Sequence, residues 1–238
     1  MFRVSLGGWP RIIIRASRRD MKPLKVYIDT NVLKFSATRL PRLHPREQEV
    51  NWGGRLHKVT VHEPVDVNPN DFIKDPRLKA EVELLPELAE AGKRGQLRYL
   101  MQMETRIEGW GIPNMDSTTG RFYGAPIEVA DAPIKYSRVI AGGLEIPKDM
   151  QFEFLTRISS KRFHELQKVT GAYQGKGNLN RNQLLDAFHL WCAEHNKCDY
   201  FLTLDLKLIR VLRRNGKSRL QVEVVRPSEL LSVVKGST

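Results

Sequence analysis

The chain has 238 residues, and its 39 Lys and Arg against 27 Asp and Glu give a formal net charge of +12 at pH 7. A hydrophobic fraction of 41% with 28% charged residues is typical of a globular protein and argues against general disorder. No apolar run approaches the roughly 18 residues that a membrane span needs, which excludes an integral membrane protein. With two cysteines, Cys192 and Cys198, the sequence excludes a disulfide framework and predicts free thiols in a reducing cytoplasm.

The excess of positive charge points toward a polyanionic partner, of which nucleic acid is the commonest. Residues 1–20 hold five Arg and one Asp, so 5 − 1 = +4 of the +12 lies there. Their apolar run, Ile12–Ile14, is too short for a secretory signal, and Met21 is an alternative start. We interpret residues 1–20 as a flexible basic arm and residues 21–238 as a single domain.

Three short runs of β-forming residues are each followed by a polar turn, as buried parallel strands are. They are LKVYI at 24–28, DYFLTL at 199–204 and LQVEVV at 220–225. Residues 206–214 have helical spacing and would connect the last two runs as a right-handed crossover. This alternation predicts an α/β protein with helices on both faces of a sheet.

The middle of the chain gives a less regular pattern. It predicts a helix at 77–92 interrupted at Pro86, a strand at 97–101, a short helix at 103–110 and helical structure at 149–170. The clearest helix begins near Asn180 and carries an apolar stripe, made of Leu184, Leu185, Phe188, Trp191 and Cys192. Insertions are expected at about 40–95 and at 111–147, the second of them rich in hairpins. The fold class is therefore a three-layer α/β/α domain with a central, mainly parallel sheet and an inserted hairpin-rich segment.

Three aspartates are candidates for one site. Asp29 and Asp205 follow predicted strands, whose carboxyl ends line the ligand crevice in open α/β sheets, and Asp186 lies early in the clearest helix. Taken singly, each has an ordinary alternative, as a turn or helix cap or as an exposed helix residue. Converging carboxylates repel one another unless a cation lies between them, and oxygen ligands select Mg²⁺ or Mn²⁺. Such a site suits the hydrolysis of phosphodiester bonds.

VYIDTNVL at 26–33 and LLDAFHLWCAEHNKCDYFLTLDLKLI at 184–209 resemble motifs of the PIN-domain family of ribonucleases. The first is similar to the opening strand and first acidic motif of that family, and the second is similar to its third and fourth acidic motifs. The final stretch, VEVVRPSELL, resembles the closing strand and helix. The similarity covers about a third of the chain, at its two ends. It implies a PIN-like fold and a cytoplasmic, metal-dependent endoribonuclease that uses Mg²⁺ or Mn²⁺.

Carried over residue by residue, the resemblance makes Asp29, Asp186 and Asp205 catalytic metal ligands, with Asn31 and Thr203 as supporting polar residues. The family also has an acid in the helix after its second strand. Here both Glu104 and Glu108 are candidates; the spacing favours Glu108 as the fourth ligand and leaves Glu104 in a supporting role. The distances along the chain, 108 − 29 = 79 and 186 − 108 = 78 residues, exceed those of a compact family member and reflect the insertions.

Several alternatives remain open on the sequence. Asn31 stands where a phosphatase of the aspartyl-phosphate type needs a second Asp, which argues against that chemistry. A catalytically inactive PIN-like protein that binds RNA or acts as a scaffold is the main rival, and the toxin half of a toxin–antitoxin pair is another. RNA is the expected substrate with DNA not excluded, and an antitoxin or a second copy of the chain are the candidate protein partners.

Other residues were weighed for a functional role. His189, three residues after Asp186, is interpreted as a residue that packs or forms structural hydrogen bonds, because an oxygen site does not require imidazole. The spacing of the histidines and cysteines does not favour a zinc site. Aromatic residues in the insertions, Trp52, Trp110 and Tyr123, are expected to be core residues of those segments, although they could stack on bases.

Overall fold

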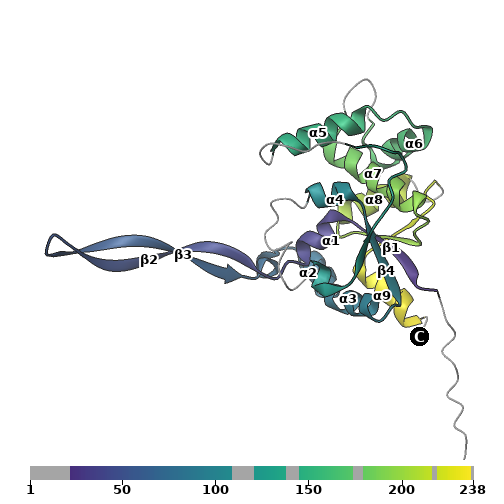
Figure 1. The fold of residues 1–238 in the computed structure, drawn as a ribbon. Helices are drawn as coiled ribbons and strands as arrows, with labels where there is room; N and C mark the ends of the chain where they lie inside the picture. The colour runs from purple at the N-terminus through teal and green to yellow at the C-terminus, as the bar shows by residue number, and fades with distance from the viewer. Residues whose placement is uncertain (1–21, 109–120, 138–144, 174–178, 216–218, 237–238) are drawn as a thin grey trace, which may run out of the picture.

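The computed structural model describes residues 22–108, 121–137, 145–173, 179–215 and 219–236, so the basic arm at 1–20 lies outside the described residues. The main body is α/β, with helices on both faces of a sheet and one long β-ribbon extending away from it (Figure 1). Within the described residues, no helix has both the length and the apolar character that crossing a membrane would require.

The central sheet has five strands in the order β5-β4-β1-β6-β7, and every neighbouring pair runs parallel. In chain order the strands are β1 (Leu24–Ile28), β4 (Leu97–Met101), β5 (Ile127–Val129), β6 (Tyr200–Leu202) and β7 (Glu223–Val225). The three strands expected from apolar runs near the chain ends are therefore present, two of them shorter than predicted. A mainly parallel sheet flanked by helices, as predicted, is the observed architecture.

The strands bury side chains on both faces because helices cover both. In β1, Tyr27 belongs to one apolar core while its neighbours Val26 and Ile28 belong to the other, as the two-residue period of a strand requires. The Tyr27 face is covered by the helices α5 (Glu145–Thr156), α6 (Lys161–Thr170), α7 (Arg181–His195) and α8 (Leu206–Asn215). The opposite face is covered by α1 (Thr30–Phe35), α2 (Pro76–Val82), α3 (Leu85–Lys93) and α9 (Pro227–Gly236).

The helix α7 is buried more completely than a single apolar stripe implies. Asn180 caps it as predicted, accepting a hydrogen bond from the Gln183 backbone N–H at 3.2 Å. Its residues 184, 185 and 187–194 are all buried, because α7 lies against the sheet on one side and packs against α5 and α6 on the other.

The first expected insertion contains the ribbon. β2 (Leu40–Trp52) and β3 (Arg55–Val67) pair antiparallel over their whole length and are joined by Gly53-Gly54. Both glycines have positive φ, 61° and 76°, as the tight primed turns of two-residue hairpins require. A 3-10 turn (Pro69–Phe72) then leads into α2.

The second insertion differs from the hairpin-rich segment that the sequence predicted. Its described part forms a 3-10 turn (Arg121–Gly124) and β5, which joins the central sheet parallel to β4. Residues 109–120 and 138–144, including Trp110, lie outside the described residues. In the part that is described, the Gly and Pro residues thus lie on either side of an edge strand of the main sheet and not in a separate hairpin.

Candidate active site

The candidate site lies at the carboxyl edge of the sheet, where its topology changes direction. From β1 the chain proceeds to β4 on one side, and from β6 it proceeds to β7 on the other. Open α/β sheets bind ligands at such a switch point, because the loops after the two strands diverge and leave a crevice. Asp29 follows β1 directly, and Asp205 follows β6 by three residues.

Asp29 is held by a set of short hydrogen bonds. Its Oδ1 accepts a hydrogen bond from the Thr30 backbone N–H at 2.7 Å, which caps α1. Its Oδ2 accepts from Asn31 Nδ2 at 2.7 Å and from the Thr203 hydroxyl at 2.6 Å. Asn31 Oδ1 in turn accepts from the Leu204 backbone N–H at 2.9 Å, so it links the loops after β1 and β6. Asn31 and Thr203 thus both fix the orientation of the Asp29 carboxylate.

Asp186 and Asp205 line one cavity of about 170 Å³ between α7 and the start of α8. Asp205 is exposed, and its Oδ1 caps α8 by accepting hydrogen bonds from the backbone N–H groups of Lys207 and Leu208, both at 2.8 Å. Asp205 is therefore both a helix cap and a member of the cavity wall. Lys207 also lines this cavity and brings a positive charge to its rim.

Glu108 ends α4 (Met103–Glu108) and faces α7 and α1. His189 Nε2 lies 2.8 Å from Glu108 Oε2, and the Thr30 hydroxyl donates to the same oxygen. On its other side, His189 Nδ1 lies 3.1 Å from the Tyr27 hydroxyl. The buried imidazole therefore holds the Glu108 carboxylate against the end of β1.

Glu104, the other candidate for the fourth acid, belongs to a different network. It is fully buried, and its carboxylate accepts hydrogen bonds from the Tyr136 hydroxyl at 2.8 Å and from Gln151 Nε2 at 2.7 Å. The Tyr136 hydroxyl also accepts from Gln102 Nε2 at 2.6 Å. These bonds tie the first turn of α4 to α5 and to the loop after β5. Glu104 therefore anchors the helix that ends in Glu108.

The charges at this edge of the sheet act on one another. Burial raises the pKa of Asp29 to about 6; His189 and Thr203 oppose this effect, and Glu108 adds to it. Burial also raises the pKa of Asp186 well above its ordinary value, and repulsion from Asp29, Asp205 and Glu108 raises it further. Burial alone would lower the pKa of His189, but the adjacent Glu108 outweighs it and the pKa is about 9. The four acids thus form one electrostatic cluster around a protonated imidazole.

The donor set suits a hard divalent cation. The four carboxylates supply oxygen atoms only, and two of them are costly to ionise where they are, which a nearby cation would offset. In the described part of the chain, however, no three His, Cys, Asp or Glu side chains are grouped as a ready-made metal site. The chemistry of the residues fits such an ion, and their side chains would have to turn toward it.

A second cavity, of about 480 Å³, adjoins the acidic cluster across the first turn of α8. Its lining is basic, with Arg77, Arg210, Arg213 and Arg226 against a single acid, Glu81. Leu206, directly after Asp205, also lines it. Positive charge therefore lies next to the acids on the side where α2, α8 and α9 meet.

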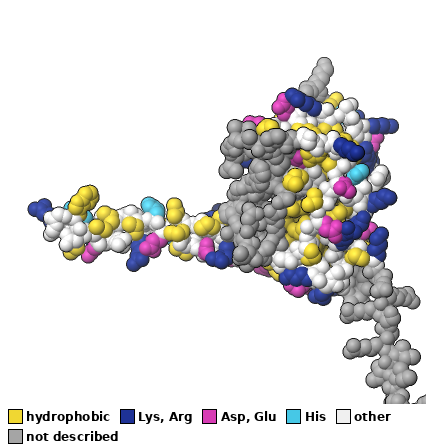
Figure 2. Space-filling view, viewed as in Figure 1, with side chains coloured by type: hydrophobic (Ala, Val, Ile, Leu, Met, Phe, Trp, Pro, Cys, Tyr) yellow, Lys and Arg dark blue, Asp and Glu magenta, His cyan; other side chains and the backbone are white. Residues whose placement is uncertain are grey.

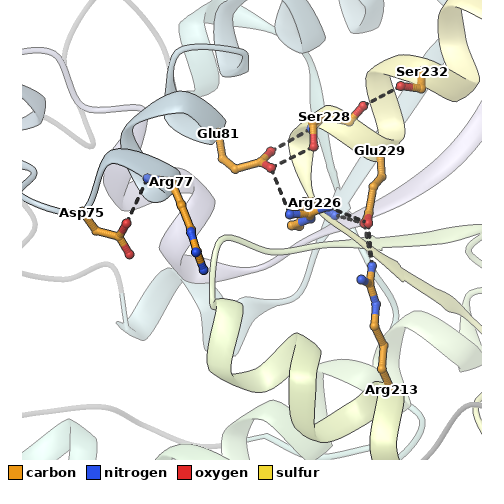
Figure 3. A network of polar contacts seen from close by, with 8 residues as sticks. All are labelled: Asp75, Arg77, Glu81, Arg213, Arg226, Ser228, Glu229 and Ser232. Carbon is orange, nitrogen blue, oxygen red and sulfur yellow. Dashed lines mark hydrogen bonds and ion pairs between the residues drawn. The ribbon is translucent and has the colours of Figure 1, made fainter.

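Figure 3 shows how part of this basic lining is fixed. Arg226 lies between Glu81 and Glu229, and Arg213 reaches Glu229 from α8 with two contacts of 2.7 Å. Glu81 also accepts two hydrogen bonds of 2.8 Å from Ser228, which join α2 to the start of α9. Among the described residues, no carboxylate is ion-paired with Arg77 or with Arg210. As far as the described part of the chain shows, these two guanidinium groups carry charges that no carboxylate neutralises, although Arg210 Nε donates to the Leu206 carbonyl at 3.2 Å.

The structure thus brings together Asp29, Glu108, Asp186 and Asp205, together with Asn31 and Thr203, and it places Glu104 apart. Sequence reasoning predicted that His189 packs or forms structural hydrogen bonds, and its contacts with Glu108 and Tyr27 agree with this prediction. It did not single out Thr30, which contacts Glu108, or Tyr27, which contacts His189. The Asp-Ala-x-His spacing was the available signal, because it puts His189 less than one helical turn after Asp186.

The prediction that aromatic residues of the insertions are core residues agrees with the structure for Tyr123 and is wrong for Trp52. Tyr123 is partly buried and packs against the core, whereas Trp52 is 78% exposed at the tip of the ribbon. A two-stranded ribbon has no interior that could bury it.

Comparison of the chain with protein-family models, with curated proteins and with solved structures gave no match in any of the three searches.

Proposed function

We propose that the chain is a metal-dependent endoribonuclease with a PIN-like fold, which hydrolyses phosphodiester bonds at the cluster of Asp29, Glu108, Asp186 and Asp205. The observation that supports this proposal is that four acids from four separate segments act on one another electrostatically at the switch point of a parallel sheet. Clustered acids with raised pKa values are costly to a fold, and they are typical of functional sites. Their resemblance in type and order to the PIN-domain motifs points to the same chemistry.

The proposed cofactor is Mg²⁺ or Mn²⁺, held by these four carboxylates. When bound, such an ion would supply the charge that polarises a phosphate and makes a water molecule more acidic. Asn31 and Thr203 keep the Asp29 carboxylate pointing into the crevice. His189 and Thr30 hold Glu108 beside it, and the Glu104 network fixes the helix that carries Glu108. The protein's contribution is thus to fix each carboxylate before substrate arrives.

The basic cavity supports the choice of a polyanionic substrate. Arg77 and Arg210 have no acidic partner within the described residues; Arg210 lies in α8, five residues after Asp205, and Arg77, in α2, lines the same cavity. We expect one nucleic-acid strand to place one phosphate group at Arg77 and Arg210 and another at the acidic cluster. The pairing of an acidic centre with a basic flank is what a nuclease needs, because the flank attracts the backbone and the acids act on it.

Cleavage of a labelled RNA with Mg²⁺ or Mn²⁺, and its loss in EDTA, is the first test. Asp29→Asn and Asp186→Asn should fold and lose at least about a hundredfold in kcat, a loss typical of removing one preorganised charged group. Asp131→Asn is the matched control, because Asp131 is exposed and lies outside the cluster. Activity of both site variants equal to that of the parent would refute the proposal. Metal-independent RNA binding by a parent that does not cleave would favour the inactive, RNA-binding alternative.

A further inference from the structure

The β-ribbon is a feature that the proposed chemistry does not use. Among the described elements, β2 and β3 make extensive contacts only with each other, and Figures 1 and 2 show the ribbon projecting from the body with side chains exposed along its length. At roughly 3.4 Å per residue, its 13-residue strands extend about 44 Å. An isolated two-stranded ribbon is marginally stable in water, so a ribbon of this length implies a partner along it.

The register of the ribbon separates its charges onto two faces. Directly opposed residues share a face, so the even-numbered residues of β2 lie with the odd-numbered residues of β3. This face, called here the basic face, has the charged residues Arg42, Arg46, Arg55 and Glu63, for a net charge of 3 − 1 = +2. The opposite face has Lys58, Glu47, Glu49 and Asp66, for a net charge of 1 − 3 = −2.

The basic face also carries an aromatic group at its outer end. Trp52 is 78% exposed and is paired with Arg55 across the turn. Proteins that bind single-stranded nucleic acid combine exposed aromatic and cationic side chains, because bases stack on the aromatic ring while the guanidinium contacts phosphate. His44 and His57 lie on the same face.

The base of the ribbon is connected to the acidic cluster through the helix α1. Asp29 caps α1, which ends at Phe35, and the ribbon begins at Leu40. Asn70, just after the ribbon, donates a hydrogen bond of 2.9 Å to the Phe35 carbonyl and so fixes the base to the end of α1. Arg42, near the base, lies over the Phe72 ring at 4.2 Å. A strand held along the ribbon would therefore run toward the carboxyl edge of the sheet.

We infer that the basic face of the ribbon binds single-stranded RNA and guides it to the acidic cluster. The cationic groups extend from the level of Arg42 to that of Trp52, ten residues or about 34 Å, which matches a linear polyanion better than a compact protein surface. A second copy of the chain is disfavoured, because a twofold dimer would place the +2 face against itself. The identity of the bound RNA as a substrate rests on the proposed function; binding by the ribbon does not.

The test uses the full-length chain in EDTA, so that binding is measured without cleavage. Anisotropy of a labelled 20-nucleotide RNA gives the Kd and its salt dependence. Arg55→Gln on the basic face and Lys58→Gln on the opposite face form a matched pair, because both residues are exposed, lie on β3 and lose one positive charge. A lost phosphate contact reduces the salt slope by about 0.7, which corresponds to about fourfold in Kd near 0.15 M salt.

Arg55→Gln should therefore weaken binding about fourfold and Lys58→Gln should leave it unchanged. The triple change of Arg42, Arg46 and Arg55 to Gln should weaken it on the order of fifteenfold, because Arg46 is already ion-paired with Glu63 at 3.0 Å and two unpaired cations are lost. Trp52→Ala should weaken binding about fivefold or more without changing the salt slope, because stacking is not ionic.

Equal effects of Arg55→Gln and Lys58→Gln, or no effect of the triple change, would overturn the inference. So would equal affinity for polyglutamate of the same charge, which would indicate an acidic protein partner, or dimerisation that depends on the ribbon. Metal-dependent cleavage is measured separately. Ribbon-dependent binding by a parent that does not cleave would support the ribbon's role and reject the nuclease, whereas intact cleavage with ribbon-independent binding would do the reverse.

Discussion

The raised pKa of Asp29 predicts that this residue destabilises the metal-free fold at neutral pH. Raising the pKa from its ordinary value of 3.8 to about 6 corresponds to about 3 kcal/mol. A carboxyl whose pKa is higher in the folded state stabilises the fold fully below about pH 4 and loses that contribution as the pH rises through about 6. Asp29→Asn has no charge to ionise, so its stability relative to the parent should increase by about 3 kcal/mol between pH 3 and pH 7.

The measurement is urea unfolding in EDTA at several pH values, for the parent, for Asp29→Asn and for the control Asp131→Asn. The change with pH is the relevant quantity, because the variant also alters hydrogen bonds to Asn31 and Thr203 by a fixed amount. Addition of Mg²⁺ should stabilise the parent and not the variant, since an ion that binds only the folded state adds RT ln(1 + [L]/Kd). A stability difference independent of pH, or one that decreases as the pH rises, would refute the reasoning.

Three further changes test other parts of the structure. Glu104→Gln should cost about 1–3 kcal/mol of unfolding free energy, because an amide cannot accept all the hydrogen bonds of the buried carboxylate, and it should retain RNA cleavage. Glu108→Gln should abolish RNA cleavage and should also lower stability at pH values below about 9, because the buried His189 imidazolium loses its carboxylate partner; cleavage lost only in Glu104→Gln would exchange their roles. Arg210→Gln should raise KM for RNA with little change in kcat, and Arg214→Gln, an exposed position outside the basic cavity, should change neither. Gly92→Ala should cost about 1–3 kcal/mol, because its Cβ would lie 2.4 Å from the Tyr99 ring, while Gly236→Ala, which meets nothing within 4 Å, should have little effect in the same thermal unfolding assay.

The ribbon shows why one element escaped the sequence analysis although its signal was present. Gly53-Gly54 between two alternating segments is a strong hairpin signal. The three prolines of the ribbon, Pro41, Pro45 and Pro64, weakened it, because proline is excluded from central strands. In a two-stranded ribbon both strands are edges, so proline is tolerated.

The roles of Glu104 and Glu108 could not be separated by sequence. Two residues four apart lie on the same side of a helix, so spacing alone favours neither strongly. Their hydrogen-bond partners distinguish the two residues: Tyr136 and Gln151 donate to Glu104, while His189 and Thr30 contact Glu108. These partners lie between 32 and 81 residues away in the chain, and only the packing of α4 between α5 and α1 brings them together.

The sequence by itself determined the parallel sheet and the positions of Asp29 and Asp205, because buried strands are local apolar runs and polar residues follow them directly. It also located most of the net charge outside the N-terminal arm. Only the tertiary structure decided where that charge lies: part of it forms a basic cavity beside Asp205 and part forms one face of the ribbon. Charge placement depends on which helices meet and on cross-strand register, and both are set by contacts between residues far apart in the sequence.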